Sequence, residues 1–117
     1  MGNRLPGREY KAVFNGARVL RGRFCVAHVA RGKADGCGPA AGVVATKRTF
    51  HDAVDRNRAK RLMREAFRLS APSLEPGFRC ILIARRHIGG GTKMQDVRAE
   101  LDRIFHKNGG GPAAGTR

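Results

Sequence analysis

The chain has 117 residues, and its 24 lysines and arginines outnumber 9 aspartates and glutamates, which gives a formal net charge of +15. A charge of this size opposes compact folding through self-repulsion and exceeds what solubility requires, so it predicts a polyanionic partner. The longest apolar run, residues 80–84, is far shorter than the roughly 18 residues of a membrane span, so no membrane partner is expected.

The N-terminus and the cysteines predict a cytoplasmic protein. The first residues lack the apolar core of a signal peptide, and no myristoylation motif is present. Cys25, Cys37 and Cys80 are odd in number and widely spaced, without a CxxC pair, so they are expected to be reduced thiols. The histidines form no cluster with these cysteines, and no zinc site is therefore expected.

Length and composition predict one domain over residues 1–107. The last stretch, residues 108–117, is rich in glycine and has no large apolar side chain to bury, so it is predicted to be a disordered tail. A hydrophobic content of 41% is sufficient for a modest core in the remainder of the chain.

The N-terminal third of the chain changes from a helical to an alternating pattern. Tyr10, Val13 and Phe14 are spaced i, i+3 and i+4, which predicts a short helix over residues 7–15. Apolar residues then alternate across residues 18–30, as a strand with one face toward a core requires.

The middle of the chain predicts a loop, an extended segment and a long helix. Residues 32–39 contain three glycines and a proline and are expected to be a loop, and residues 41–49 are expected to be extended. Asp52 is the predicted N-cap of the helix, which should run to about Ser70 because Pro72 cannot continue it.

The C-terminal part predicts one more strand and one more helix. Residues 78–84 are almost continuously apolar, which is typical of a strand covered on both faces, and residues 92–107 carry apolar side chains at near-helical spacing. The predicted fold is an α/β (α+β) sandwich. It contains an N-terminal helix, a small and mostly antiparallel sheet of three to four strands, the long helix and a C-terminal helix.

The long helix is the most informative segment, because its polar and apolar residues separate onto two neighbouring arcs. At about 100° per residue, the outer arc holds one amide and four cations, namely Asn57, Lys60, Arg61, Arg64 and Arg68. The neighbouring arc is apolar and is expected to face the core, through Ala59, Leu62, Met63, Ala66 and Phe67. Cations one turn apart can follow successive phosphates, and arginine can bind a phosphate through two nitrogens.

A solvated helix face held by ion pairs is the structural alternative for this stripe. Such faces usually alternate in sign, whereas Glu65 is the only acid between Arg56 and Arg68, so nucleic-acid binding is favoured. Composition alone leaves DNA and RNA equally open.

Residues 53–68 read A-V-D-R-N-R-A-K-R-L-M-R-E-A-F-R and resemble the RNR signature of the bacterial ribonuclease P protein family. The flanks are also similar to that family: residues 10–14 to its first helix, residues 41–48 to a strand ending in a basic pair, and residues 78–86 to a strand ending in I-A-R. The resemblance covers roughly residues 4–107 in the family's order. One departure is the turn at residues 49–52, which is one residue longer than usual and lacks glycine.

The resemblance implies a subunit of an endoribonuclease whose RNA is the catalyst, so no catalytic residue is expected in the protein. Mg²⁺ would be held mainly by the RNA subunit and the substrate, which is precursor tRNA. One protein is expected to bind one RNA subunit through the signature helix, with contacts from Arg56, Asn57, Arg58, Lys60, Arg61, Arg64 and Arg68.

The resemblance also implies that the first helix and the sheet bind the single-stranded 5′ leader of precursor tRNA. Phe14 is the candidate for stacking on bases, whereas Tyr10 on the same helix is more often a core residue. The leader is expected to pass four basic residues that follow strands, namely Lys47, Arg48, Arg85 and Arg86.

Two rival functions share the basic composition. A structural RNA-binding protein of the ribosome would sediment with ribosomes and would not stimulate RNA cleavage, and a DNA-compacting protein would bind duplex DNA as well as structured RNA. A membrane-active cationic protein is a more distant alternative, suggested by the apolar face of the basic helix. The resemblance of residues 53–68 to the signature favours ribonuclease P over the ribosomal and the DNA-compacting alternatives.

Overall fold

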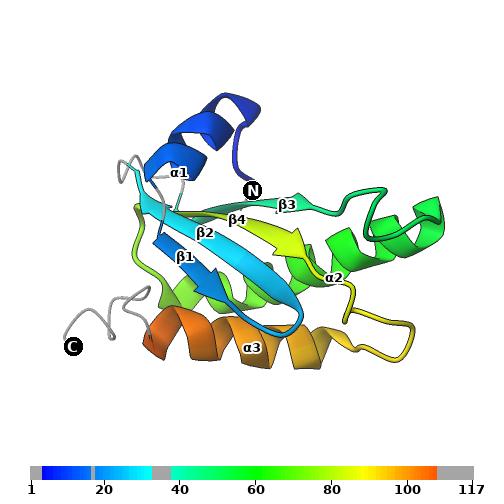
Figure 1. Ribbon diagram of the computed structural model, residues 1–117. Helices are drawn as coiled ribbons and strands as arrows, with labels where there is room; N and C mark the ends of the chain where they lie inside the picture. Colours follow the sequence, from blue (N-terminus) through cyan, green and yellow to red (C-terminus); the bar gives the residue numbers. More distant parts are fainter. Residues whose placement is uncertain (1–3, 17, 33–37, 108–117) are drawn as a thin grey trace.

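A computed structural model describes residues 4–16, 18–32 and 38–107 (Figure 1). The predicted tail at residues 108–117, and Cys37 with most of the predicted loop, lie outside the described residues. Two short 3₁₀ helices, Gly7–Glu9 and Ala71–Ser73, precede α1 and follow α2. The main elements are, in chain order, α1 (Tyr10–Gly16), β1 (Arg18–Arg21), β2 (Cys25–Arg31), β3 (Ala40–Val44), α2 (Ala53–Ser70), β4 (Phe78–Ala84) and α3 (Met94–Lys107).

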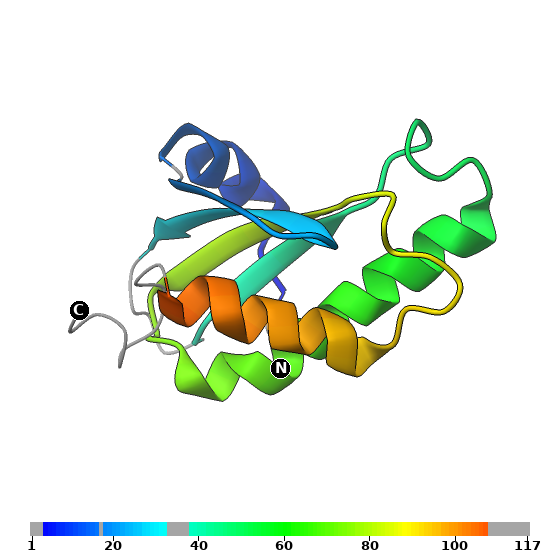
Figure 2. The same ribbon diagram turned by 60° about the horizontal axis from the view of Figure 1, so that its bottom comes forward.

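The four strands form one sheet in the order β1-β2-β4-β3. The β1–β2 and β2–β4 pairs are antiparallel, and β3 pairs with β4 in parallel, as expected when a helix connects the two strands. Figures 1 and 2 show α1 over one face of the sheet and α2 with α3 over the other. The predicted sandwich with a mostly antiparallel sheet is therefore confirmed.

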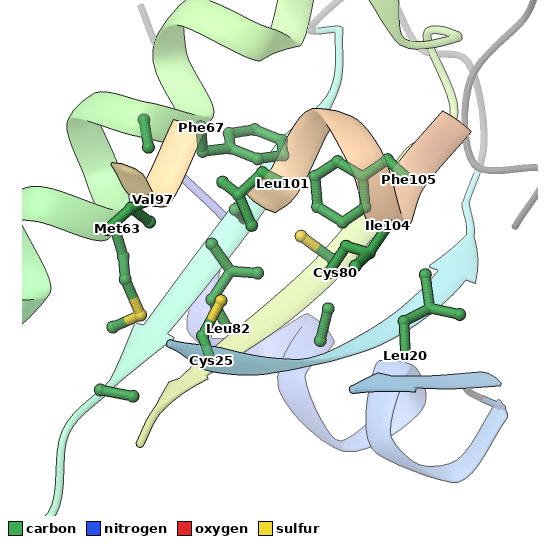
Figure 3. Close-up of a cluster of buried hydrophobic side chains, with 14 of the residues drawn as sticks. Leu20, Cys25, Met63, Phe67, Cys80, Leu82, Val97, Leu101, Ile104 and Phe105 are labelled. Atoms are coloured by element: carbon green, nitrogen blue, oxygen red, sulfur yellow. The ribbon is translucent and has the colours of Figure 1, made fainter. Parts of the chain in front are cut away.

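The main core lies between the sheet and the helix pair α2 and α3 (Figure 3). Phe67 of α2, Phe78 of β4 and Phe105 of α3 meet there, with ring centroids 4.9 Å apart for Phe78 and Phe105. The apolar arc predicted for α2 faces this core, because Ala59, Met63, Ala66 and Phe67 are buried and Leu62 is partly buried.

A smaller core lies between α1 and the opposite face of the sheet. Val13 of α1, Ile81 of β4, Leu5 and Ala40 are buried there, and Tyr10 packs against them. Since β4 also contributes to the main core, it is covered on both faces, as its continuous apolar sequence predicts.

The single strand predicted over residues 18–30 is wrong in one respect, because the chain reverses there and forms the β1–β2 hairpin. The reversal is held by Glu100, a buried carboxylate of α3. Its oxygens accept hydrogen bonds from the backbone N–H groups of Arg23, Phe24 and Cys25 at 2.6–3.1 Å. This contact joins residues about 75 positions apart, so local alternation does not reveal it.

The predicted ends of the other elements need small corrections. Asp52 occupies the N-cap position of α2, but its side chain makes no capping hydrogen bond, and only its carbonyl accepts from the Arg56 N–H, at 3.1 Å. The helix ends at Ser70, before Pro72, as predicted. Helix α3 begins at Met94, two residues later than predicted. No helix among the described residues is both long enough and apolar enough to cross a membrane.

Candidate RNA interface

The outer face of α2 carries the predicted stripe of cations. Asn57, Arg61, Arg64 and Arg68 are exposed and Lys60 is half-buried, while the opposite side of the helix is buried in the core. Within the described part of the chain, Lys60, Arg61 and Arg64 make no hydrogen bond or ion pair. Their charges are therefore available for an anion outside the protein.

Arg68 differs from the other cations of the stripe because it has an acidic partner on the same helix. Its Nη2 lies 2.9 Å from Oε1 of Glu65, and both side chains are exposed. Such a pair contributes little to stability at the surface, so little free energy is lost when it opens.

Arg56 and Arg58, in the first turns of α2, turn their guanidinium groups toward backbone carbonyls of neighbouring segments. Nη1 of Arg56 donates to the carbonyls of Phe50 at 2.9 Å and His51 at 3.1 Å. Arg58 donates from Nη1 to the Gly89 carbonyl at 2.7 Å and from Nη2 to the Thr92 carbonyl. Of the cations predicted to bind the RNA subunit, Arg56 and Arg58 thus bond to backbone carbonyls and Arg68 to Glu65. Lys60, Arg61 and Arg64 have no partner among the described residues.

Three of the four basic residues predicted for the leader path meet at one hollow. Arg48 follows β3, and Arg85 and Arg86 follow β4; because these strands are parallel, their C-terminal ends lie at the same edge of the sheet. The hollow has a volume of about 630 Å³ and is also lined by Thr49, His51, Ala84 and His87. Lys47, the fourth residue, is exposed on the turn beside Arg48.

Hydrogen bonds hold both walls of this hollow. On the β4 side, the Arg85 N–H donates to the Phe24 carbonyl at 2.8 Å, and Nη1 of Arg85 donates to the Gly22 carbonyl at 2.9 Å. On the β3 side, the turn that lacks glycine is closed by the Thr46 hydroxyl oxygen, which accepts from the Thr49 N–H at 3.2 Å. Phe50 then enters the main core, so the longer turn is accommodated without a glycine.

Phe14 lies apart from the hollow, on the same side of the sheet as α1. Its ring is 42% exposed and meets the His28 ring edge-on, with centroids 5.0 Å apart. His28 pairs with Ile81, four residues before Arg85, which corresponds to about 13 Å along the strand. Phe14 and the basic hollow are therefore two separate sites, not a single pocket.

Tyr10 is half-buried and packs in the smaller core, in agreement with the expectation that it is a core residue. Its ring lies so close to Gly42 of β3 that a Cβ atom at that position would overlap the Tyr10 hydroxyl. Glycine at position 42 thus allows α1 to approach the sheet and sets the position of Phe14.

The comparisons with known proteins assign this architecture to a family. A family model described as Ribonuclease P matches residues 4–109. The chain belongs to the ribonuclease P protein family. A relative named ribonuclease P protein component, from Symbiobacterium thermophilum, is 32% identical over 107 residues, which cover 91% of this chain and 90% of the relative. Another of that name, from an Exiguobacterium species, is 34% identical over 99 residues, covering 85% and 82%.

The fold is similar to solved structures of the ribonuclease P family. RNase P protein from Thermotoga maritima superposes with a TM-score of 0.71 at 23% identity, over 88% of this chain and 94% of that one. RNase P protein from Staphylococcus aureus superposes with a TM-score of 0.69 at 18% identity, over 90% and 94%. These similarities confirm the predicted fold.

For this member of the ribonuclease P family, the sequence reasoning missed three residues of the hollow. Thr49, His51 and His87 line it, although each is adjacent in sequence to a predicted basic residue or to the signature helix. Their closeness in sequence to Arg48 and Arg86 could have predicted that these three residues line the hollow. Among the described residues, no three histidine, cysteine or carboxylate side chains gather at a point where they could hold a metal ion.

Proposed function

We propose that this chain is the protein component of ribonuclease P and promotes removal of the 5′ leader from precursor tRNA in the cytoplasm. One protein would bind one catalytic RNA subunit, forming a heterodimeric ribonucleoprotein. The observation that carries the proposal is the stripe of cations on α2, in which Lys60, Arg61 and Arg64 have no partner among the described residues, within the residues that match the family. A stripe of one sign on an exposed helix face fits a polyanion.

In this proposal, α2 docks on the catalytic RNA. Lys60, Arg61 and Arg64 contact phosphates directly, and Arg68 exchanges Glu65 for a phosphate. Asn57 is exposed beside them and can donate or accept a hydrogen bond at a sugar or a base. Each phosphate neutralised in this way releases counterions, so assembly should weaken as the salt concentration rises.

The leader would lie on the side of the sheet that α1 partly covers. Phe14 offers an exposed aromatic face for stacking, which tolerates any base. Lys47, Arg48, Arg85 and Arg86 offer positive charge at the end of the same sheet. Since mature tRNA has no leader, these contacts would favour the precursor over the product.

The protein would contribute binding and charge, and the catalytic RNA would contribute the chemistry. Mg²⁺ would be held mainly by the RNA subunit and the substrate, where it would activate the attacking water. Positive charge on the protein would screen RNA phosphates from one another, so the holoenzyme would need less Mg²⁺ than the RNA alone.

The test is single-turnover cleavage of precursor tRNA by a bacterial catalytic RNA at low Mg²⁺, with and without this protein. The expected result is faster cleavage with the protein, and an increase that grows when the leader is lengthened from one nucleotide to several. Tight binding to the RNA without faster cleavage would indicate a structural RNA-binding protein instead. Equal affinity for duplex DNA and structured RNA would indicate a DNA-compacting protein.

The docking surface is tested separately by Arg61→Ala and Arg64→Ala. Each should weaken assembly with the RNA subunit and lower the slope of log affinity against log salt by about one, because one phosphate contact is lost. An unchanged slope in both variants would remove these two arginines from the interface.

A further inference from the structure

The two arginines at the start of the signature helix each bind a different wall of the basic hollow. Arg56 holds the carbonyls of Phe50 and His51, in the segment that also supplies Arg48. Arg58 holds the carbonyls of Gly89 and Thr92, in the segment that follows Arg85 and Arg86. Figure 1 shows both segments beside the N-terminal end of α2.

The wall that follows β4 has a particular need for such an anchor. It contains Gly89, Gly90 and Gly91, which have no side chain to pack and lose the most conformational freedom when ordered. Its own hydrogen bonds are short-range: the Gly89 N–H donates to Oγ1 of Thr92 at 3.0 Å, and the Thr92 N–H donates to the Gly89 carbonyl at 3.1 Å. Arg58 connects this turn to a helix packed on the main core.

The guanidinium of Arg58 suits this connection, and its two terminal nitrogens are both engaged in it. Two of its nitrogens point at two carbonyls, a fork that a lysine ammonium cannot reproduce. A phosphate approaching the same edge of the guanidinium would have to displace both carbonyls. Arg61 and Arg64, one and two turns later, have no such competitor among the described residues.

We infer that Arg56 and Arg58 are positioning residues, which place the walls of the basic hollow for the leader and do not dock on the RNA subunit. The inference rests on the proposed function and changes the role expected for two of its residues. The signature helix would then serve both surfaces: its first turns shape the leader site, and its later turns bind the catalytic RNA.

The first test compares Arg58→Lys with Arg98→Lys, a matched change at an exposed arginine of α3 outside both surfaces. Arg58→Lys keeps the charge and loses the fork. We expect it to lower the preference for precursor with a long leader over precursor with a one-nucleotide leader by roughly tenfold, the effect of losing a charged hydrogen bond. Arg98→Lys should leave this preference at the wild-type value. A docking role carried by charge predicts that both variants behave as wild type.

The second test measures assembly of Arg58→Ala with the RNA subunit over a range of salt concentrations, beside Arg61→Ala. Positioning predicts an unchanged salt slope for Arg58→Ala, whereas Arg61→Ala should lower it by about one. A fall of about one for Arg58→Ala would overturn the inference.

A rescue separates positioning from simple loss of folding. A Cβ atom at Gly90 would meet nothing within 4 Å. Gly90→Ala should therefore stiffen the turn without a clash. Added to Arg58→Lys, it should restore part of the leader preference and slow the hydrogen exchange of the amides at residues 85–92. Failure to restore any preference would overturn the inference, because stiffening the wall could not then replace Arg58.

The outcomes distinguish the inference from the proposed function. If the wild-type protein shows no leader preference and no stimulation of cleavage, the proposed function fails. If the wild type shows both and Arg58→Lys matches it, only the inference fails.

Discussion

The sheet has one face under α2 and α3 and another under α1. Both faces are built from similar apolar residues, but the first is covered from solvent more completely than the second. Phe67, Phe78 and Phe105 are fully buried on the first face. On the second face, Phe14 is 42% exposed and Val19 is 43% exposed, and the buried residues that the structure describes there form a small cluster around Val13. One face is a completed core, and the other keeps apolar surface in contact with solvent.

This difference indicates how a small, highly charged domain can maintain a binding surface. Burial of apolar area on the α2 and α3 face supplies most of the stability. The α1 face then needs only enough packing to hold α1 in place, and its remaining aromatic surface is free for a ligand. An exposed aromatic residue on a sheet that also has a basic edge lowers the stability gained on folding but favours binding of single-stranded nucleic acid.

The largest expected effect comes from truncating the same residue type on the two faces. Phe105→Ala removes a ring from the closed core and should lower the free energy of unfolding by about 3–5 kcal/mol. Phe14→Ala removes a ring that packs on His28 at the surface and should cost less than about 1 kcal/mol. Denaturant unfolding of both variants measures the difference. Equal losses would mean that the α1 face is part of the stabilising core.

A smaller effect is expected at the carboxylate that closes the β1–β2 turn. Glu100→Gln keeps the shape of the side chain. It places an amide N–H₂ group against the backbone N–H groups that bond to the carboxylate in the wild-type protein. We expect a loss of about 2–4 kcal/mol, since buried donors are left without partners.

Glu65→Gln is the matched control, because Glu65 is an exposed carboxylate whose one partner among the described residues is Arg68 on the same helix. It should change stability by less than about 1 kcal/mol. If Glu100→Gln were as mild as this control, the hairpin would not depend on α3.

These two residues illustrate what the sequence could predict. The core under α2 and α3 could be predicted from the periodicity of apolar residues. The apolar arc of α2 and the continuous apolar run of β4 predict burial, and both are buried. The hairpin held by Glu100 could not be found in this way, because its hydrogen bonds connect α3 with residues about 75 positions earlier. The same limit applies to Arg58, whose carbonyl partners lie 31 and 34 positions later in the chain. The partners of Arg56 are near in sequence, but they lie before the helix and outside its periodic pattern.

On the open face, Phe14→Ala should change function more than stability. Loss of one stacked base corresponds to about 1–3 kcal/mol of binding. The expected result is weaker binding of leader-bearing precursor tRNA to the holoenzyme, with unchanged binding of mature tRNA and unchanged assembly with the RNA subunit. Equilibrium binding of the two tRNA forms measures this. A defect identical to that of Arg61→Ala would contradict the division into two surfaces.

The smallest effect concerns the two thiols of the closed face. Burial raises the pKa of Cys25, the Glu100 carboxylate raises it further, and burial also raises the pKa of Cys80. In the unfolded chain, cysteine ionises with a pKa of about 8.5. At that pH each of the two thiols is still protonated in the folded state. Because the folded-state pKa is raised, this contribution to stability is complete below about pH 8.5 and declines as the pH rises above it.

The expected loss is about 1 kcal/mol per buried thiol between pH 7.5 and 9.5. Cys25→Ser provides the comparison, because a hydroxyl of similar size does not ionise in this range. Its free energy of unfolding should decline less steeply between these pH values than that of the wild type, whatever its value at pH 7. Parallel pH profiles would mean that Cys25 is already shielded from ionisation in the unfolded chain, or that α3 opens over this face at alkaline pH. Hydrogen exchange of the Cys25 amide, which bonds to Glu100, distinguishes these two cases, because only opening of α3 accelerates it.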